Sequence, residues 1–285
     1  MSLEKLTIDY HLEKLFGIEG SSDPRTNNLA TFYCKIWLVA LFYAVLSPLY
    51  LKWLPRFKKT KGKYQPMEAF IVIYNGFMFG CYGTGVAVAY WATNGLNDFF
   101  DCTPIDKNAS DPKSIMIILM GIILVNLKMV RFFEPLMYKI AGKEPPFSGI
   151  LTIDGIIVHC LAMLAIKYQC GNFFTAATFL EGIAMVLYYA HQTLKCGGFI
   201  PEYYLTWHHM NITLQILVRY AAYKHAVWGF ENPQCSDGAL RPLINIQYWG
   251  AILSLCFYVL DLFINGQTPY VIEEDENGIV HQKKL

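Results

Sequence analysis

Seven long apolar segments recur along this chain, and they constrain its fold more than any other feature. The hydrocarbon core of a bilayer is about 30 Å thick, and about 20 apolar helical residues cross it. The composition also indicates a membrane protein, because only 16% of the 285 residues are charged, whereas about a quarter are charged in soluble domains. We therefore expect an all-α membrane protein, a bundle of seven transmembrane helices. The predicted segments are 29–51, 67–90, 114–140, 147–168, 173–191, 205–228 and 243–264.

The apolar segments divide the chain into three parts. Residues 1–28 are expected outside the membrane, residues 29–266 form the seven-helix membrane domain, and residues 267–285 form a charged C-terminal tail. The acidic content of residues 1–25 excludes a signal peptide. The first apolar segment is therefore expected to act as its own uncleaved targeting signal.

Loop charge predicts the orientation. The loop after the first segment is basic, from Lys52 to Lys63, and should stay on the cytoplasmic or matrix side, whereas the loop after the second segment is acidic. Seven spans then place the N-terminus outside and the tail inside. Cys102 and Cys235 both fall in outside loops. They form a disulfide in an oxidising compartment, or they are two free thiols on one side, because pairing cannot be deduced from sequence alone.

Ionisable residues inside the third to fifth segments mark the candidate site. Lys128, Arg131 and Glu134 are about one helical turn apart and share a broad face of the third segment. Asp154 and Glu181 place carboxylates in the next two segments. Charges at membrane depth are costly and usually face a protein interior. We expect a buried ion-pair network among Lys128, Arg131, Asp154 and Glu181.

The end of the third segment has an alternative interpretation. Glu134 and Lys139 can instead extend to the inner membrane interface, as long charged side chains near helix ends do. Pro135 is expected to end or kink the helix locally, because it lacks a backbone N–H.

The order of several motifs resembles the fatty-acid elongase family, the very-long-chain 3-oxoacyl-CoA synthases that condense malonyl-CoA with an acyl-CoA. The shared features are Tyr74-Asn75, a cysteine in each of two outside loops, Lys128 with an acid six residues on, Met185 followed by Tyr188-Tyr189, and Leu214-Gln215. The resemblance covers about residues 30–270. It implies a seven-helix bundle of elongase type that encloses a narrow acyl tunnel. Glycines in the second segment permit close helix packing; they are Gly76, Gly80, Gly83 and Gly85.

The catalytic motifs of that family are degenerate in this chain. Its histidine box, HxxHH, falls on Leu151, Asp154 and Gly155, and the histidine of HxxMYxYY falls on Gly182. Family elongases use imidazole as nucleophile and base, a role for which a group titrating near neutral pH is suited. Leu, Gly and Asp cannot replace it one for one. No residue is therefore assigned a catalytic role. The degenerate positions are Lys128, Arg131, Glu134, Leu151, Asp154, Gly155, Gly182 and Gln215.

The histidines that remain do not form a recognisable site. His159 follows Asp154 by five residues, so the two lie about 140° apart around a helix. No HxxxH or CxxC pair is present, and no metal site is predicted. We expect structural histidines that bond to a carbonyl or are hydrated at an interface. His11, His225 and His281 carry no pattern that indicates a role.

Two functions follow from these observations. The first is a catalytically inactive elongase-like protein that serves as a structural or lipid-binding subunit of a larger membrane assembly. The alternative is an active elongase. Transport is disfavoured because the charges cluster in segments three to five instead of recurring through paired halves. We expect no cofactor, with a bound lipid or acyl chain as the ligand, and membrane lipids and other membrane subunits as partners.

The sequence also bears on nucleic-acid binding and on the cellular compartment. No basic patch interleaved with aromatic residues indicates nucleic acid. The endoplasmic reticulum and the mitochondrial inner membrane both remain open, because Lys283-Lys284-Leu285 misses the dilysine retrieval pattern of family members.

Overall fold

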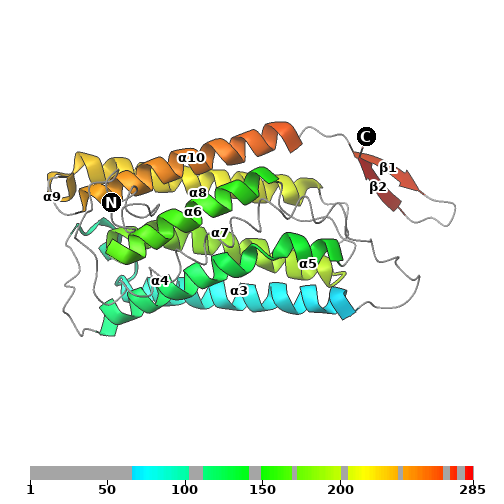
Figure 1. The fold of residues 1–285 in the computed structure, drawn as a ribbon, viewed down its shortest axis with the longest axis horizontal. Coiled ribbons are helices and arrows are strands. Elements are labelled where there is room, and N and C mark those ends of the chain that lie inside the picture. Colours follow the sequence, from blue (N-terminus) through cyan, green and yellow to red (C-terminus); the bar gives the residue numbers. More distant parts are fainter. Residues whose placement is uncertain are drawn as a thin grey trace, which may run out of the picture.

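The structure is a computed structural model that describes residues 66–102, 112–140, 149–168, 172–199, 205–236, 240–265, 270–274 and 280–284. Its long helices run side by side along the longest axis of the molecule (Figure 1). They are α3 (Pro66–Ala92), α4 (Pro112–Arg131), α6 (Gly149–Tyr168), α7 (Asn172–Cys196), α8 (Leu205–Glu231) and α10 (Arg241–Asn265). Shorter elements are η2 (Asn97–Phe100), α5 (Glu134–Ile140) and α9 (Pro233–Ser236).

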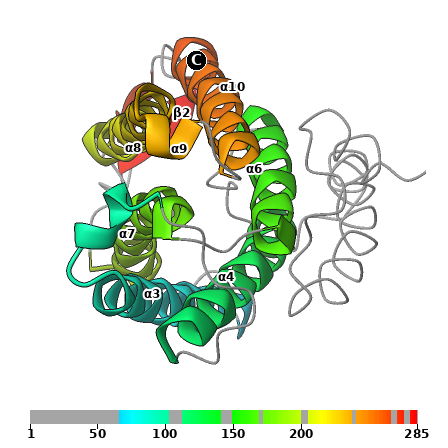
Figure 2. The same cartoon turned by 90° about the vertical axis from the view of Figure 1, so that its left-hand side faces the viewer.

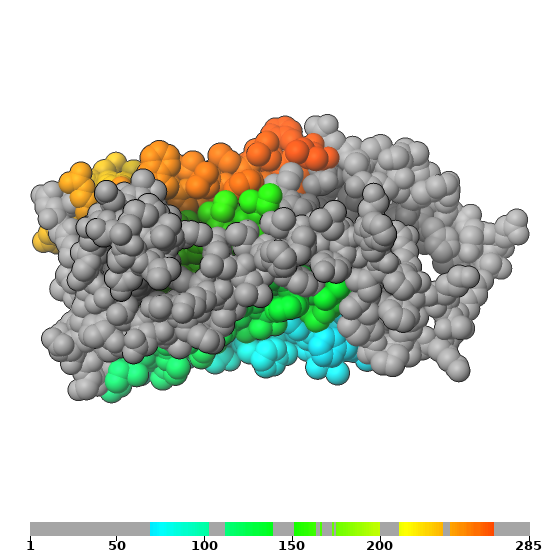
Figure 3. Space-filling view, in the orientation of Figure 1, coloured from blue at the N-terminus to red at the C-terminus, as the bar shows by residue number. Residues whose placement is uncertain are grey.

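The six long helices form a closed ring. Viewed end-on, their order around the ring is α3, α4, α6, α10, α8 and α7 (Figure 2), and each helix contacts both of its neighbours. In the space-filling view α10 lies along one long edge of the molecule and α3 along the opposite edge (Figure 3). A ring of this kind lets every long helix present one face inward, where the charged residues of the third to fifth predicted segments are found.

Six of the seven predicted segments are helices, and the first, 29–51, lies outside the described residues. Three described helices are long and apolar enough to cross a membrane, by length and composition: Ala69–Ala92, Pro112–Tyr138 and Arg241–Ile264. In α6 the apolar stretch is shorter, Leu151–Met163. The helices α7 and α8 carry Glu181 and Arg219 near their centres, and polar residues of this kind lower the apolarity of a helix. The described helices therefore fit a membrane protein.

The outward surface of α3 is apolar. Ile73 and Phe77 are 68% and 61% exposed, as expected for side chains that face lipid. Of the glycines in this helix, Gly85 is the one in tight contact, since a Cβ there would lie 3.1 Å from Cε of Met120 on α4. Added Cβ atoms at Gly80 and Gly83 meet nothing within 4 Å. Among the described residues of α3, close packing at a glycine is therefore seen at Gly85 and not at Gly80 or Gly83.

The third predicted segment is interrupted where Pro135 requires it. The helix α4 ends at Arg131, residues 132–133 form a turn, and α5 begins at Glu134. Phe132 and Phe133 bond to carbonyls three residues back, Met129 and Val130. Proline has no N–H for the carbonyl four residues before it and its ring collides with that carbonyl. The predicted break is confirmed.

The C-terminal tail, expected only to be charged, contains a β-hairpin. Strands β1 (Tyr270–Glu274) and β2 (Val280–Lys284) pair antiparallel, with Tyr270 opposite Lys284 and Glu274 opposite Val280. Asn277-Gly278 lies between the strands in the sequence, and this dipeptide favours tight hairpin turns. The tail therefore adds a small two-stranded sheet to the helices of the described residues.

Candidate functional site

The helix ring surrounds a cavity of about 150 Å³. All six long helices contribute to its wall, which is made mostly of small or apolar side chains such as Gly85, Ala89 and Val125. A mostly apolar wall of this kind suits an apolar ligand. The polar and charged part of the wall includes Tyr82, Lys128, Thr175, Thr178, Glu181, Arg219, Gln247 and Ser254.

A charged cluster joins three helices at this cavity. Lys128 on α4 forms a salt bridge with Glu181 on α7. The guanidinium of Arg219 on α8 lies 3.8 Å from the same carboxylate oxygen, and its Nε donates a hydrogen bond of 3.1 Å to Oγ of Ser254. The guanidinium also lies 5.1 Å from the centre of the Tyr258 ring. Two cations thus share the Glu181 carboxylate, which offsets the cost of burying its charge.

A second, smaller cavity of about 30 Å³ lies against the same cluster. Lys128, Glu181 and Arg219 line both cavities. On its other sides the small cavity is lined by Arg131 and Asp154, among others. Val158 lines both cavities as well, and these four residues form the junction between the mostly apolar cavity and the polar one.

The predicted pair of Lys128 and Glu181 is present, whereas Asp154 faces Arg219, a residue outside the predicted set. Lys128 contacts Glu181 directly. Asp154 is 3% exposed and interacts with Arg219 and Ser254. Its Oδ1 has no hydrogen-bond partner in the described part of the chain. Arg219 was missed, although a lone arginine inside an apolar segment is the same signal that singled out Glu181.

Arg131 and Glu134 lie next to this junction. The Arg131 guanidinium is 5.9 Å from the centre of the Tyr188 ring. Glu134 is fully buried, and its Oε1 accepts hydrogen bonds from Oη of Tyr74, at 2.7 Å, and from Oη of Tyr189. The interpretation that Glu134 extends to the membrane interface is therefore wrong. The turn at residues 132–133 directs α5 back against α3. There Oε1 of Glu134 meets Tyr74 of α3 and Tyr189 of α7, while Oε2 has no hydrogen-bond partner among the described residues.

The degenerate box positions of α6 line the small cavity. Leu151 and Gly155 belong to its wall together with Asp154. Leu151 also packs with Ile212 and Tyr258 in an apolar cluster, and a Cβ added at Gly155 would lie 3.7 Å from the Phe132 ring. The positions that would carry the histidine box thus face a cavity, but two of them present hydrocarbon or backbone to it.

Two other degenerate positions, Gly182 and Gln215, differ in whether they line a cavity. Gly182 lines the large cavity, yet a Cβ there would lie only 2.8 Å from Cγ2 of Val86, so a larger residue needs the Val86 side chain or α3 to shift. Gln215 is 2% exposed, and neither polar atom of its side chain has a partner among the described residues. Gln215 is not among the residues that line either cavity.

His159 does not match the expectation of a carbonyl-bonded or hydrated imidazole. It is fully buried, and its ring lies edge-on to Phe132 with centroids 5.7 Å apart. Neither ring nitrogen has a hydrogen-bond partner within the described ranges. The helix α6 turns this residue into the packed interior, where aromatic contact replaces polar contact.

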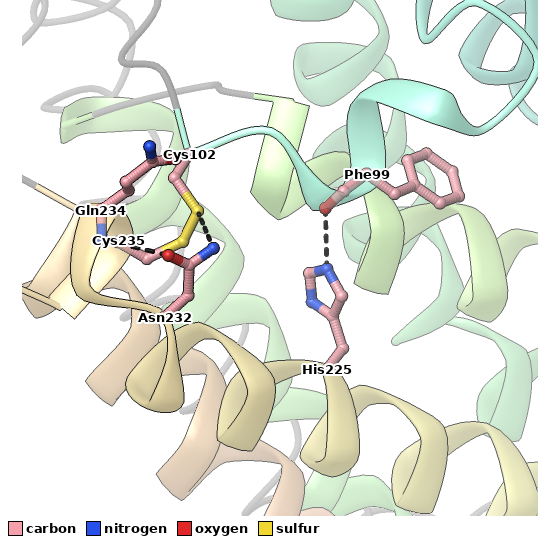
Figure 4. Close-up of a disulfide and its surroundings, with 6 residues drawn as sticks. All are labelled: Phe99, Cys102, His225, Asn232, Gln234 and Cys235. Carbon is pink, nitrogen blue, oxygen red and sulfur yellow. Dashed lines mark hydrogen bonds between the residues drawn. A yellow bond between two sulfur atoms is a disulfide. The ribbon is translucent and has the colours of Figure 1, made fainter.

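His225 is a structural residue whose role the sequence did not reveal. Figure 4 shows its ring pointing to the Phe99 carbonyl, close to the disulfide between Cys102 and Cys235. Nε2 of Gln247 lies 2.9 Å from Nδ1 of His225. Nε2 of His225 lies 2.9 Å from the carbonyl oxygen of Phe99. Because the amide donates to Nδ1, the hydrogen is on Nε2 and is donated to the carbonyl.

The disulfide and His225 both tie the segment around η2 to elements later in the chain. The two Cα atoms of the disulfide are 5.0 Å apart, and the bridge links the segment after η2 to α9. Asn232 supports the bridge, since its Nδ2 lies 3.8 Å from Sγ of Cys102 and its Oδ1 accepts a hydrogen bond from the backbone N–H of Gln234. The two predicted outside loops therefore lie together at one end of the bundle.

The described residues contain no group of three or more His, Cys, Asp or Glu side chains placed to hold a metal ion. Searches against known proteins add no relative, since no family model and no curated protein matches this chain. The two cavities and their junction are the features of the described residues that bear on function.

Proposed function

We propose that this chain is an elongase-like membrane protein that binds a lipid acyl chain without elongating it. In this proposal the seven predicted segments form a seven-helix bundle of elongase type. The protein serves as a structural or lipid-binding subunit of a larger membrane assembly, in the endoplasmic reticulum or the mitochondrial inner membrane.

One observation carries the proposal. The positions where the family's box histidines fall line the two cavities, and they hold Leu151, Asp154, Gly155 and Gly182. The space beside Gly182 is taken by Val86. Condensation through an imidazole nucleophile needs a nucleophile and a base at these positions, whereas holding an apolar chain needs only the apolar wall of the large cavity.

A malonyl-CoA condensation assay tests the absence of catalysis. The purified full-length protein is incubated with malonyl-CoA and long-chain acyl-CoA, beside an elongase that carries the histidine box as positive control. We expect no 3-oxoacyl-CoA from this protein. Turnover that survives purification to a single species would overturn the proposal.

The assembly part of the proposal has its own test. The protein is extracted from its native membrane in mild detergent and run on a native gel with an antibody to the chain. Migration far above that of the 32.6 kDa monomer in its detergent micelle supports a larger assembly. Migration as a monomer under conditions that preserve known complexes of the same membrane contradicts it.

A working condensing enzyme is the second candidate, and one observation favours it. His159 is a fully buried imidazole without a hydrogen-bond partner in the described part of the chain, and it contacts Phe132, which lines the small cavity. If any turnover is found, His159→Gln should abolish it. Retained turnover in that variant would exclude His159 as the base.

A further inference from the structure

We propose that the large cavity holds only the uncharged methyl end of one lipid acyl chain, a segment of about six carbons, with the charged cluster as its end wall. This inference rests on the proposed acyl-binding function and adds the length and the charge of the bound segment. It follows from the place of the cluster, from its charge balance and from the volume of the large cavity.

The charged cluster lies at one end of the large cavity. On α4 the residues that line the large cavity run from Ile117 to Lys128, and those that line the small cavity run from Lys128 to Pro135. On α6 the two sets meet at Val158 in the same way. The large cavity therefore extends from the cluster toward the beginning of α4 and away from α5.

The charges of the cluster and its neighbours balance. Three cations each face a carboxylate: Lys128 faces Glu181, Arg219 faces Asp154, and Arg131 faces Glu134. No cation or carboxylate is left over to pair with a charged ligand. Because burying an unpaired charge is costly, the segment that enters the large cavity is uncharged.

The volume of the large cavity limits the length of the segment. The cavity measures about 150 Å³. An engineered cavity of about the same volume in another protein holds benzene, a molecule of about six carbons. Most of the wall is apolar, which suits hydrocarbon. A longer acyl chain therefore leaves its remaining carbons outside this cavity.

Three phosphatidylcholine probes with a photoreactive diazirine on one acyl chain test the length and the charge. The first carries the diazirine near the methyl end, and the second carries it more than about six carbons from that end. The third is the first with its terminal methyl group replaced by a carboxylate. The full-length protein is reconstituted in phosphatidylcholine vesicles with each probe and irradiated, and the labelled residues are identified by mass spectrometry.

Label inside the cavity is compared with label on the lipid-facing surface. Met120 and Leu124 of α4 line the large cavity, whereas Ile73 and Phe77 of α3 are exposed on the outward surface. The ratio of cavity label to surface label corrects for the amount of each probe that reaches the bilayer interior. We expect this ratio to be at least about tenfold higher for the first probe than for the second or the third.

A variant that fills the cavity should remove the label. Ala251 of α10 lines the cavity, and Ala251→Leu adds an isopropyl group to its wall. The label on Met120 and Leu124 from the first probe should fall at least about tenfold. The matched control is Ala87→Leu, at an exposed alanine of α3 that is not among the lining residues, and it should leave the label unchanged.

The outcomes separate this inference from the proposed function. A ratio for the second or the third probe that equals that of the first overturns the short, uncharged segment and leaves chain binding in place. Absence of label on Met120 and Leu124 from every probe overturns both. Label that persists in Ala251→Leu, or is lost in Ala87→Leu, contradicts the assignment to this cavity. If Ala251→Leu does not fold, Ala89→Leu decides, since Ala89 of α3 also lines the cavity.

Discussion

Lys128 and Glu181 lie 53 residues apart in the sequence and form a salt bridge where the two cavities meet. The bridge joins α4 to α7 across the inside of the ring, since these helices are not neighbours around it. A contact that spans the ring places the charged cluster where both cavities meet it. Arg219 approaches the same carboxylate from a third helix.

Removing one partner of this salt bridge should be costly. Glu181→Leu leaves Lys128 and Arg219 without their shared carboxylate, and breaking a buried pair in this way costs about 3–5 kcal/mol. The free energy of unfolding in detergent measures the loss. The double variant Lys128→Met with Glu181→Leu should recover more than half of it, because an apolar pair often replaces a buried ion pair without loss.

A matched control tests whether the loss of stability in Glu181→Leu comes from burial of the ion pair. Glu231 is an exposed acid at the end of α8, and Glu231→Leu should change the free energy of unfolding by less than about 0.5 kcal/mol. Equal losses in Glu231→Leu and Glu181→Leu would show that the charge at Glu181 is not buried and paired.

The acceptor of two tyrosine hydroxyls should also be essential for stability. Glu134→Leu leaves the hydroxyls of Tyr74 and Tyr189 without their acceptor, at a cost of about 2 kcal/mol or more. Glu134→Gln keeps an acceptor oxygen and should cost clearly less. Unfolding followed by tyrosine and tryptophan fluorescence compares them. Similar small losses in both variants would support a side chain at the membrane interface instead.

A methyl group at Gly182 should strain the ring. Gly182→Ala brings a Cβ to 2.8 Å from Val86, and overpacking of this kind costs about 1–3 kcal/mol. The matched control is Gly80→Ala, where the added Cβ meets nothing within 4 Å and the alanine should be neutral or stabilising. Val86→Ala should relieve the strain in a double variant. Equal melting temperatures for the two alanine variants would contradict the close contact of α3 and α7.

Reduction of the disulfide should lower the melting temperature. Cys102 and Cys235 are separated by 133 residues, and cross-links over long loops contribute about 2–5 kcal/mol. Thermal unfolding with and without reductant should therefore differ for the unmodified protein and not for Cys102→Ser. Cys256→Ser, at an exposed free cysteine, should behave like the unmodified protein in both conditions. A melting temperature insensitive to reductant would exclude a stabilising bridge.

Much of the helical layout could be predicted, because helix formation at membrane depth is a local property. The segments predicted at 67–90 and 243–264 agree with α3 and α10 within three residues. The break before Pro135 was also predictable from one residue, since the missing N–H and the ring collision act within one turn. The end of α7 was less predictable. Polar residues after His191 suggest a helix end, yet the helix continues to Cys196.

The candidate site could be predicted only in part. Lys128, Asp154 and Glu181 were found because charges inside apolar segments are rare and face the interior. The surroundings of Glu134 and His159 could not be predicted from the sequence. Which hydroxyls meet the Glu134 carboxylate depends on α3 and α7, which are distant in the sequence, and the burial of His159 depends on Phe132 after the turn at residues 132–133.

The sequence by itself determined where the helices lie and which charges enter the apolar core, because backbone hydrogen bonding and hydrophobicity act over neighbouring residues. Only the tertiary structure decided that Lys128 pairs with Glu181, that Arg219 joins them, and that Val86 fills the space beside Gly182. These contacts join helices far apart along the chain. Their geometry depends on how closely the helices of the ring approach each other, a distance that no local pattern specifies.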